Sequence, residues 1–163
     1  MTVTKARKLI VCLDGTGNEV EKNESNILRL YKCLKHDDSQ LAYYEPGVGT
    51  LSTRPFAQTL FVRSKQVLGL IAGIGLEANV MHAYRFLCEN YRPGDQLYFF
   101  GYSRGAYTAR VLAGFINDFG LVAPHELHLI GPVFKAWRKL RKDSPRKAFA
   151  PLRISEQFFH IQH

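Results

Sequence analysis

Apolar residues along this chain fall either in short continuous runs or in longer stretches of helical spacing, and their order predicts an α/β protein. Residues 9–13 form a continuous apolar run of strand length, and residues 97–100 form another. Runs that are apolar on both faces are typical of buried parallel strands. Residues 41–44 offer a third short strand, which is closed by a turn-rich loop.

Three stretches have the apolar spacing of amphipathic helices. The first follows Ser25, a residue type that commonly caps a helix N-terminus. The second covers residues 76–91 and ends at a Pro-Gly pair, and the third begins just after Ser103. Strands alternating with helices indicate a mostly parallel sheet covered by helices. Residues 51–66 have a mixed pattern, and we expect an irregular excursion there.

The passage from strand 97–100 into the third helix contains the pentapeptide Gly101-Tyr102-Ser103-Arg104-Gly105, a G-x-S-x-G sequence. Strand, sharp turn and helix in this order are the context of the nucleophile elbow of α/β-hydrolases. The two glycines supply the small residues that a close strand–helix approach needs. Backbone N–H groups at the start of the helix could hold an oxyanion. Short motifs also match ordinary turns by chance, so the residues alone leave both interpretations open.

Asp14 stands where the strand 9–13 ends, before a glycine-rich turn. An acid there could orient a catalytic group or bind a metal, which makes Asp14 a candidate site acid. It could also cap the loop by accepting nearby N–H groups, and the chemistry alone favours this interpretation.

A rival motif, Gly73-x-Gly75-x-x-Ala78, has the form of a dinucleotide-binding fingerprint. Such a site needs an acidic ribose ligand at the end of the next strand, but Asp95 precedes that strand. We therefore expect no nucleotide and no other cofactor. His82, beside the apolar stripe of the second helix, is interpreted as an ordinary helix residue.

The composition indicates one globular domain over residues 1–163, with 46% hydrophobic residues and a formal net charge of +8. No apolar run is long enough for a membrane span, and the first residues lack the apolar stretch of a signal peptide, so we expect a cytoplasmic protein. The cysteines are expected to be buried thiols, because each lies within an apolar pattern, and no Cys/His cluster predicts a zinc site. We expect no metal.

The net charge is concentrated in residues 135–147, which contain seven Lys or Arg residues and one acidic residue, Asp143, so that seven minus one leaves +6. Such a segment could contact phosphates of nucleic acid or of lipid head groups. A solvated surface is the more ordinary interpretation of a charge run, and we do not expect nucleic acid as a partner. We predict a basic, poorly defined tail over residues 121–163.

Four stretches together carry a resemblance to a known family, in order and in spacing: residues 13–18, residues 43–50, residues 83–87 with 93–95, and residues 100–110. The chain resembles the uncharacterised α/β-hydrolase domain family that includes phospholipase effectors delivered by type VI secretion. The resemblance covers about residues 8–120 and implies a three-layer α/β sandwich with a mostly parallel sheet. It also implies a Ser-Asp-His hydrolase that acts on esters, lipid esters among them. Export by a specialised secretion system is a further possibility that the resemblance suggests.

Within the resemblance, Ser103 matches the nucleophile, and the backbone N–H of Arg104 matches the first oxyanion donor. The loop after the first strand, at Gly15 or Thr16, is where such hydrolases take the second donor. The acid and the histidine of the triad should follow Ser103, but no later acid or histidine of this chain stands in a recognisable motif. His160 and His163 are not expected to serve, because terminal residues commonly fray.

We therefore expect a hydrolase truncated after the elbow helix, with little activity of its own. The alternative is a degenerate, non-catalytic module that binds a partner or an anionic surface through residues 135–147.

Overall fold

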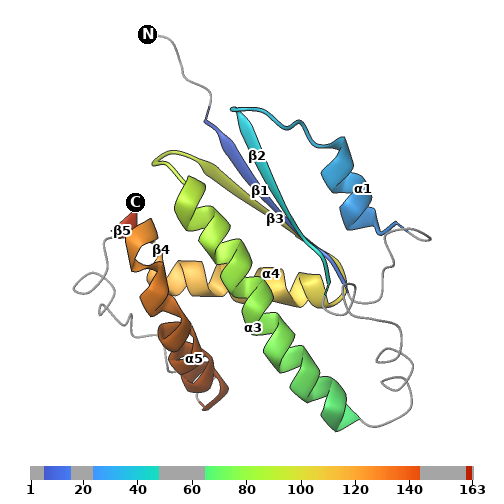
Figure 1. Ribbon diagram of the computed structural model, residues 1–163, viewed down its shortest axis with the longest axis vertical. Helices are drawn as coiled ribbons and strands as arrows, with labels where there is room; N and C mark the ends of the chain where they lie inside the picture. Colours follow the sequence, from blue (N-terminus) through green and yellow to red (C-terminus); the bar gives the residue numbers. More distant parts are fainter. Residues whose placement is uncertain (1–5, 16–23, 48–64, 144–160, 163) are drawn as a thin grey trace.

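The computed structural model describes residues 6–15, 24–47, 65–143 and 161–162. Its centre is a parallel sheet of three strands, β1 (Lys8–Leu13), β2 (Gln40–Glu45) and β3 (Gln96–Gly101), in the order β2-β1-β3 (Figure 1). Leu13 aligns with Glu45 on one side and with Gly101 on the other. The carboxyl ends of the three strands therefore lie level at one edge of the sheet, where ligand sites of such folds are usually found.

β1 is the central strand, and residues 9–13 are buried on both faces, as their continuous apolar run predicted. Leu9, Val11 and Leu13 pack into the larger core, whereas Ile10 and Cys12 pack into a smaller one on the opposite face. This division follows from the period of two along a strand.

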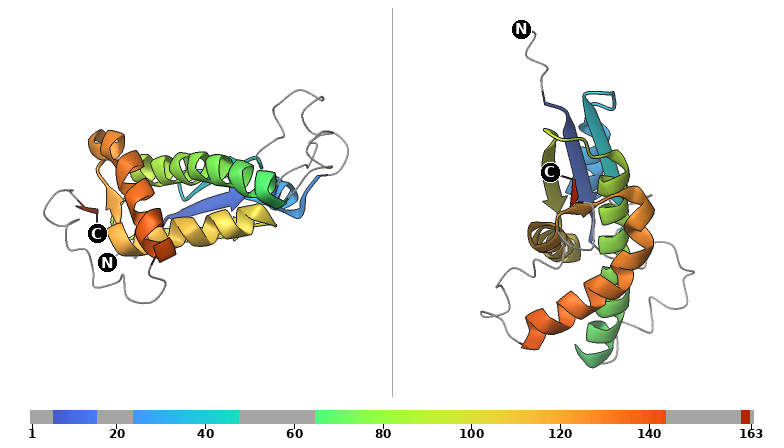
Figure 2. Two further views of the ribbon diagram at one scale, coloured as in Figure 1. Left: turned by 90° about the horizontal axis from the view of Figure 1, so that it is seen from below. Right: turned by 90° about the vertical axis from the view of Figure 1, so that its left-hand side faces the viewer.

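Helices cover both faces of the sheet and complete a three-layer α/β sandwich. α1 (Asn26–Cys33) packs on the face of the smaller core, and Ser25 caps it by accepting a hydrogen bond from the Leu28 N–H at 3.0 Å. α3 (Lys65–Asn90) and α4 (Arg104–Phe119) pack on the other face (Figures 1 and 2). The predicted fold class is confirmed.

α3 begins at Lys65, eleven residues before the predicted start at Leu76 (76 minus 65). The glycines of the rival fingerprint, Gly73 and Gly75, therefore lie within a helix. A dinucleotide fingerprint needs a tight turn from a strand into a helix N-terminus to bind a pyrophosphate. That turn does not exist at these glycines, and the residues 51–64 of the expected irregular excursion lie outside the described residues.

Much of the expected tail is ordered structure. After α4 come β4 (Leu121–Val122), the short 3₁₀ helix η1 (Pro124–Glu126) and α5 (Leu127–Asp143), and β5 (Ile161–Gln162) pairs antiparallel with β4. The buried side of α5 carries Ile130, Phe134 and Trp137 into the larger core.

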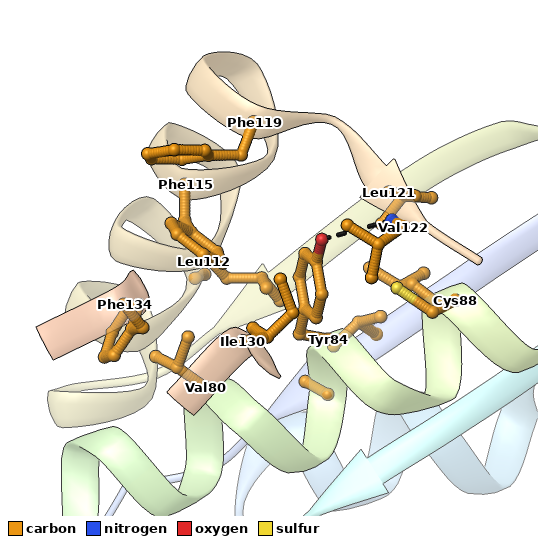
Figure 3. Packing of buried hydrophobic residues seen from close by; sticks show 14 of the residues in the cluster. Val80, Tyr84, Cys88, Leu112, Phe115, Phe119, Leu121, Val122, Ile130 and Phe134 are labelled. Carbon is orange, nitrogen blue, oxygen red and sulfur yellow. Dashed lines mark hydrogen bonds between the residues drawn. The ribbon is translucent and has the colours of Figure 1, made fainter. Parts of the chain in front are cut away.

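The Phe115 ring of α4 lies at the centre of this packing, with its centroid 5.1 Å from that of Phe134 and 5.2 Å from that of Trp137. Tyr84 of α3 joins the same cluster, and its hydroxyl accepts a hydrogen bond from the Val122 N–H at 3.3 Å (Figure 3). Aromatic packing of this kind adds about 0.5–1.5 kcal/mol per pair beyond burial of area. α5 is therefore part of the domain core.

Two of the three cysteines are buried, as predicted, and all three are free thiols. Burial raises the pKa of Cys12 to about 11 and that of Cys88 to about 12, so neither is a reactive thiolate at neutral pH. Cys33 differs from the prediction, because the last residue of α1 is exposed. Within the described ranges, no cluster of His, Cys, Asp or Glu could hold a metal ion, and no helix could cross a membrane.

Candidate active site

The turn between β3 and α4 places Ser103 in a backbone conformation that residues other than glycine rarely adopt. Ser103 has φ +52° and ψ −119°, and it is the one non-glycine residue with positive φ among the described parts of the chain. Such a conformation costs about 1–3 kcal/mol and persists only where the surrounding structure enforces it. The serine is exposed at the carboxyl edge of the sheet, directly before the first residue of α4.

Both glycines of the pentapeptide are required by close backbone contacts. A Cβ at Gly101 would lie 2.5 Å from the Gly105 carbonyl oxygen, and a Cβ at Gly105 would lie 2.0 Å from the Leu13 carbonyl oxygen. Backbone atoms cannot move aside as a flexible side chain could. The glycines therefore allow α4 to begin directly against the ends of β3 and β1.

The end of β1 also contacts the turn that contains Ser103. The Tyr102 N–H donates to the Leu13 carbonyl oxygen at 3.1 Å. Gly15 lies so close that a Cβ added to it would be 3.1 Å from the Cβ of Ser103. The loop after β1 and the serine turn are thus packed against each other, although they lie about 90 residues apart in sequence.

The first turn of α4 contains the candidate oxyanion donor. Gly105 N–H donates to the Tyr102 carbonyl at 2.8 Å, and Ala106 N–H donates to the Ser103 carbonyl at 3.1 Å. Arg104 is the first residue of α4, so its N–H has no acceptor within the helix. The Gly15 N–H, the candidate second donor, donates to Asp14 Oδ1 at 2.7 Å. Thr16, the other candidate, lies outside the described residues.

Asp14 is buried, with 3% of its surface exposed, and its carboxylate joins three elements. Besides the Gly15 N–H, it accepts hydrogen bonds from the Ser25 hydroxyl at the cap of α1 and from the Tyr44 hydroxyl of β2 at 2.8 Å. Burial and the contact with Asp14 raise the pKa of Tyr44. These contacts agree with the capping interpretation of Asp14, and they anchor the loop that touches Ser103.

A second polar contact at the same edge escaped the sequence analysis. Glu45, the buried last residue of β2, has its Oε1 atom 3.4 Å from Nδ1 of His82, and it accepts a hydrogen bond from the Tyr43 hydroxyl. The sequence pattern gave no signal for this pair, because Glu45 and His82 meet only through the packing of α3 on β2. The His82 side chain is 60% exposed.

Two of the acidic and histidine residues that follow Ser103, Asp118 and His128, have other partners. Asp118 accepts a hydrogen bond from Trp137 Nε1 at 2.7 Å, and His128 Nδ1 lies 2.9 Å from the His125 carbonyl. Among the described residues, no hydrogen bond joins Ser103 to a histidine. His160 and His163 lie outside those residues.

The order β2-β1-β3, with helices on both faces and a sharp turn from β3 into α4, defines an α/β protein with a hydrolase-like core. Residues 7–160 match the family described as "T6SS, Phospholipase effector Tle1-like, catalytic domain", and the chain belongs to that family. The resemblance inferred from the sequence motifs is thereby confirmed.

A relative with the printed name "Uncharacterized protein YEL023C", from Saccharomyces cerevisiae, is 32% identical over 166 residues. The match covers 95% of this chain but 24% of the relative, so the chain spans about a quarter of the length of that relative. No solved structure matches the chain.

Proposed function

We propose that the chain provides the nucleophile of a hydrolase of lipid esters, and that Ser103 is this nucleophile. The observation that carries the proposal is the strained backbone of Ser103 between two glycines that cannot be replaced without a backbone clash. Strain that the surrounding structure enforces at an exposed polar residue is characteristic of functional sites. The family description names phospholipases, which supports lipid esters as the substrate class.

In the proposed reaction, Ser103 Oγ attacks the acyl carbon of the ester while a histidine takes the hydroxyl proton. The carbonyl oxygen then becomes an oxyanion, for which the Arg104 N–H and the positive end of the α4 dipole provide stabilisation. The second donor comes from the loop after β1. Either Thr16 supplies it, or Gly15 exchanges its contact with Asp14 for one with the oxyanion.

The triad acid and histidine are not assigned to residues of this chain. Hydrolases that lack triad members lose about four to six powers of ten in rate, because a serine hydroxyl without its base is a poor nucleophile and attacks slowly. We therefore expect slow ester hydrolysis by the chain alone.

The test is hydrolysis of p-nitrophenyl butyrate and p-nitrophenyl palmitate by the purified chain, with folding checked by circular dichroism. Ser103→Ala should remove the slow turnover, since it removes the attacking oxygen. The matched control is Ser39→Ala, which removes an exposed hydroxyl from the turn before β2 and should leave the rate unchanged. Turnover that persists unchanged in Ser103→Ala would contradict the assignment of Ser103 as the nucleophile.

A further inference from the structure

The outer side of α5 combines exposed leucines with exposed lysines. Leu129 and Leu140 are 44% and 49% exposed, and the Lys135 side chain is 68% exposed. Lys139 is also exposed. These four residues are called the α5 surface below. Figure 2 shows α5 at the end of the molecule away from α1.

The α5 surface is distinct from the side of the helix that packs into the core. Ile130, Phe134 and Trp137 follow the spacing of one helix face and are buried. Leu129 and Leu140 are eleven residues apart, which is about three helical turns, so they lie along one line of the helix. Lys135 and Lys139 are four residues apart and form a second line. Leu129 and Leu140 belong neither to the buried cluster that contains these three residues nor to the partly buried residues packed against it.

Charge is also divided between the two sides of α5. Arg141 lies over the Trp137 ring at 5.1 Å and within 3.9 Å of Asp118, so its guanidinium is directed toward α4. Lys135 Nζ lies 3.4 Å from Glu77 Oε1, and such an exposed pair is weak and readily exchanged for another anion. Residues 127–143 contain five Lys or Arg residues and one Asp, a net charge of +4.

We propose that the α5 surface binds to a bilayer that contains anionic phospholipids. Lysines beside exposed leucines fit a lipid interface, because the ammonium groups reach phosphates while the apolar side chains enter the acyl boundary. A nucleic acid would use the positive charge but would gain little from leucines. The inference does not depend on the chemistry of Ser103, since binding to vesicles is measured without turnover.

The experiment is flotation of the purified chain with two kinds of vesicle, one of phosphatidylcholine alone and one that also contains about 30% phosphatidylglycerol. The second kind supplies the anionic lipid that attracts basic segments. Binding should require the anionic lipid and should weaken with added salt. The variant Lys135→Gln/Lys139→Gln should bind about 30-fold more weakly, about fivefold for each lysine. Leu129→Ser/Leu140→Ser should bind about tenfold more weakly, because about half of each side chain leaves the lipid interface.

Three controls make the outcome decisive. Lys32→Gln/Lys35→Gln removes the same charge from exposed lysines within and just after α1, whose side chains are 55% and 74% exposed, and should change binding less than twofold. Lys135→Arg/Lys139→Arg keeps the charge and should retain binding. All exchanged side chains are exposed, so circular dichroism should show folded variants, and Leu140→Ser alone should still bind more weakly than the parent chain.

Equal binding to both kinds of vesicle would overturn the proposal, and so would equal losses for the α1 and α5 lysine pairs. A leucine variant that binds as well as the parent would also overturn it, because charge alone would then explain the binding. Tighter binding to a double-stranded RNA than to anionic vesicles at the same salt concentration would assign the surface to nucleic acid instead.

Discussion

At the scale of single residues, the candidate site depends on two positions that have no Cβ atom, Gly101 and Gly105. The backbone of β1 occupies the place where Gly105 would carry a Cβ, and the first turn of α4 occupies the place where Gly101 would carry one. The serine between them is strained because the strand must turn sharply into a helix that is already fixed against β1. This packing causes the strain, and the composition of the pentapeptide does not predict it.

Gly105→Ala should destabilise the chain strongly, because its Cβ would meet the Leu13 carbonyl oxygen at 2.0 Å. We expect a loss of about 2–4 kcal/mol in the free energy of unfolding, measured by urea denaturation. Gly131→Ala in α5 is the matched control, since a Cβ there meets nothing within 4 Å. The control should change stability by less than about 1 kcal/mol in either direction. Equal effects of the two exchanges would show that the elbow glycine is not required by packing.

At the scale of elements, the sequence predicted what local patterns determine. The three sheet strands and the helix after Ser103 were predicted within a residue or two, because continuous apolar runs and helical stripes report burial directly. The Ser25 cap was also predicted, since capping is a local interaction. The candidate site residues Ser103, Asp14 and Gly15 were named from the same motifs, and the structure brings all three to one edge of the sheet.

Tertiary packing determined what the sequence pattern missed. α5 was interpreted as part of a tail because its dense Lys and Arg residues obscure the apolar spacing of Ile130, Phe134 and Trp137. The start of α3 was predicted at Leu76 instead of Lys65, and the already disfavoured fingerprint glycines Gly73 and Gly75 lie within this helix. The contact between Glu45 and His82 depends on how a helix lies on a strand, which no single stretch of sequence encodes.

The opposite edge of the sheet carries a pH-dependent contact between elements. Arg7, just before β1, donates hydrogen bonds to the Asp95 carboxylate before β3, with Nη2 and Oδ2 2.7 Å apart, and also contacts the Asn90 carbonyl at the end of α3. Burial alone would raise the pKa of Asp95, but the guanidinium and the Arg92 N–H outweigh it and hold the pKa below its ordinary value.

A carboxyl group whose pKa is lowered on folding stabilises the folded state above its unfolded pKa of about 3.9, and this stability is lost as the pH falls through the folded value. Asp95→Asn should therefore cost about 1–3 kcal/mol at pH 6.5. The difference between parent and variant should shrink below about pH 3.5, as measured by urea denaturation at both pH values. A difference that stays constant with pH would show that the ionised form of Asp95 contributes nothing.

At the scale of the whole molecule, parallel register gathers the chemistry at one edge. Because Leu13, Glu45 and Gly101 are aligned, the polar residues that follow or end the three strands share one side of the domain. α5 lies at another side, where its outer residues can meet a surface without obstructing that edge (Figure 1). The proposed reactive edge and the proposed docking helix therefore lie on different sides of the domain.

The identity of the nucleophile is the central claim, and site-resolved labelling tests it most directly. The folded chain is incubated with a fluorophosphonate probe, and peptide mass spectrometry locates the phosphonylated residue. Because hydrolases keep part of their catalysis without a triad histidine, we expect the adduct to form slowly at Ser103 and at least about 100-fold more slowly at Ser39. Adducts spread evenly over the serines, or their absence from Ser103 after prolonged exposure, would contradict the assignment.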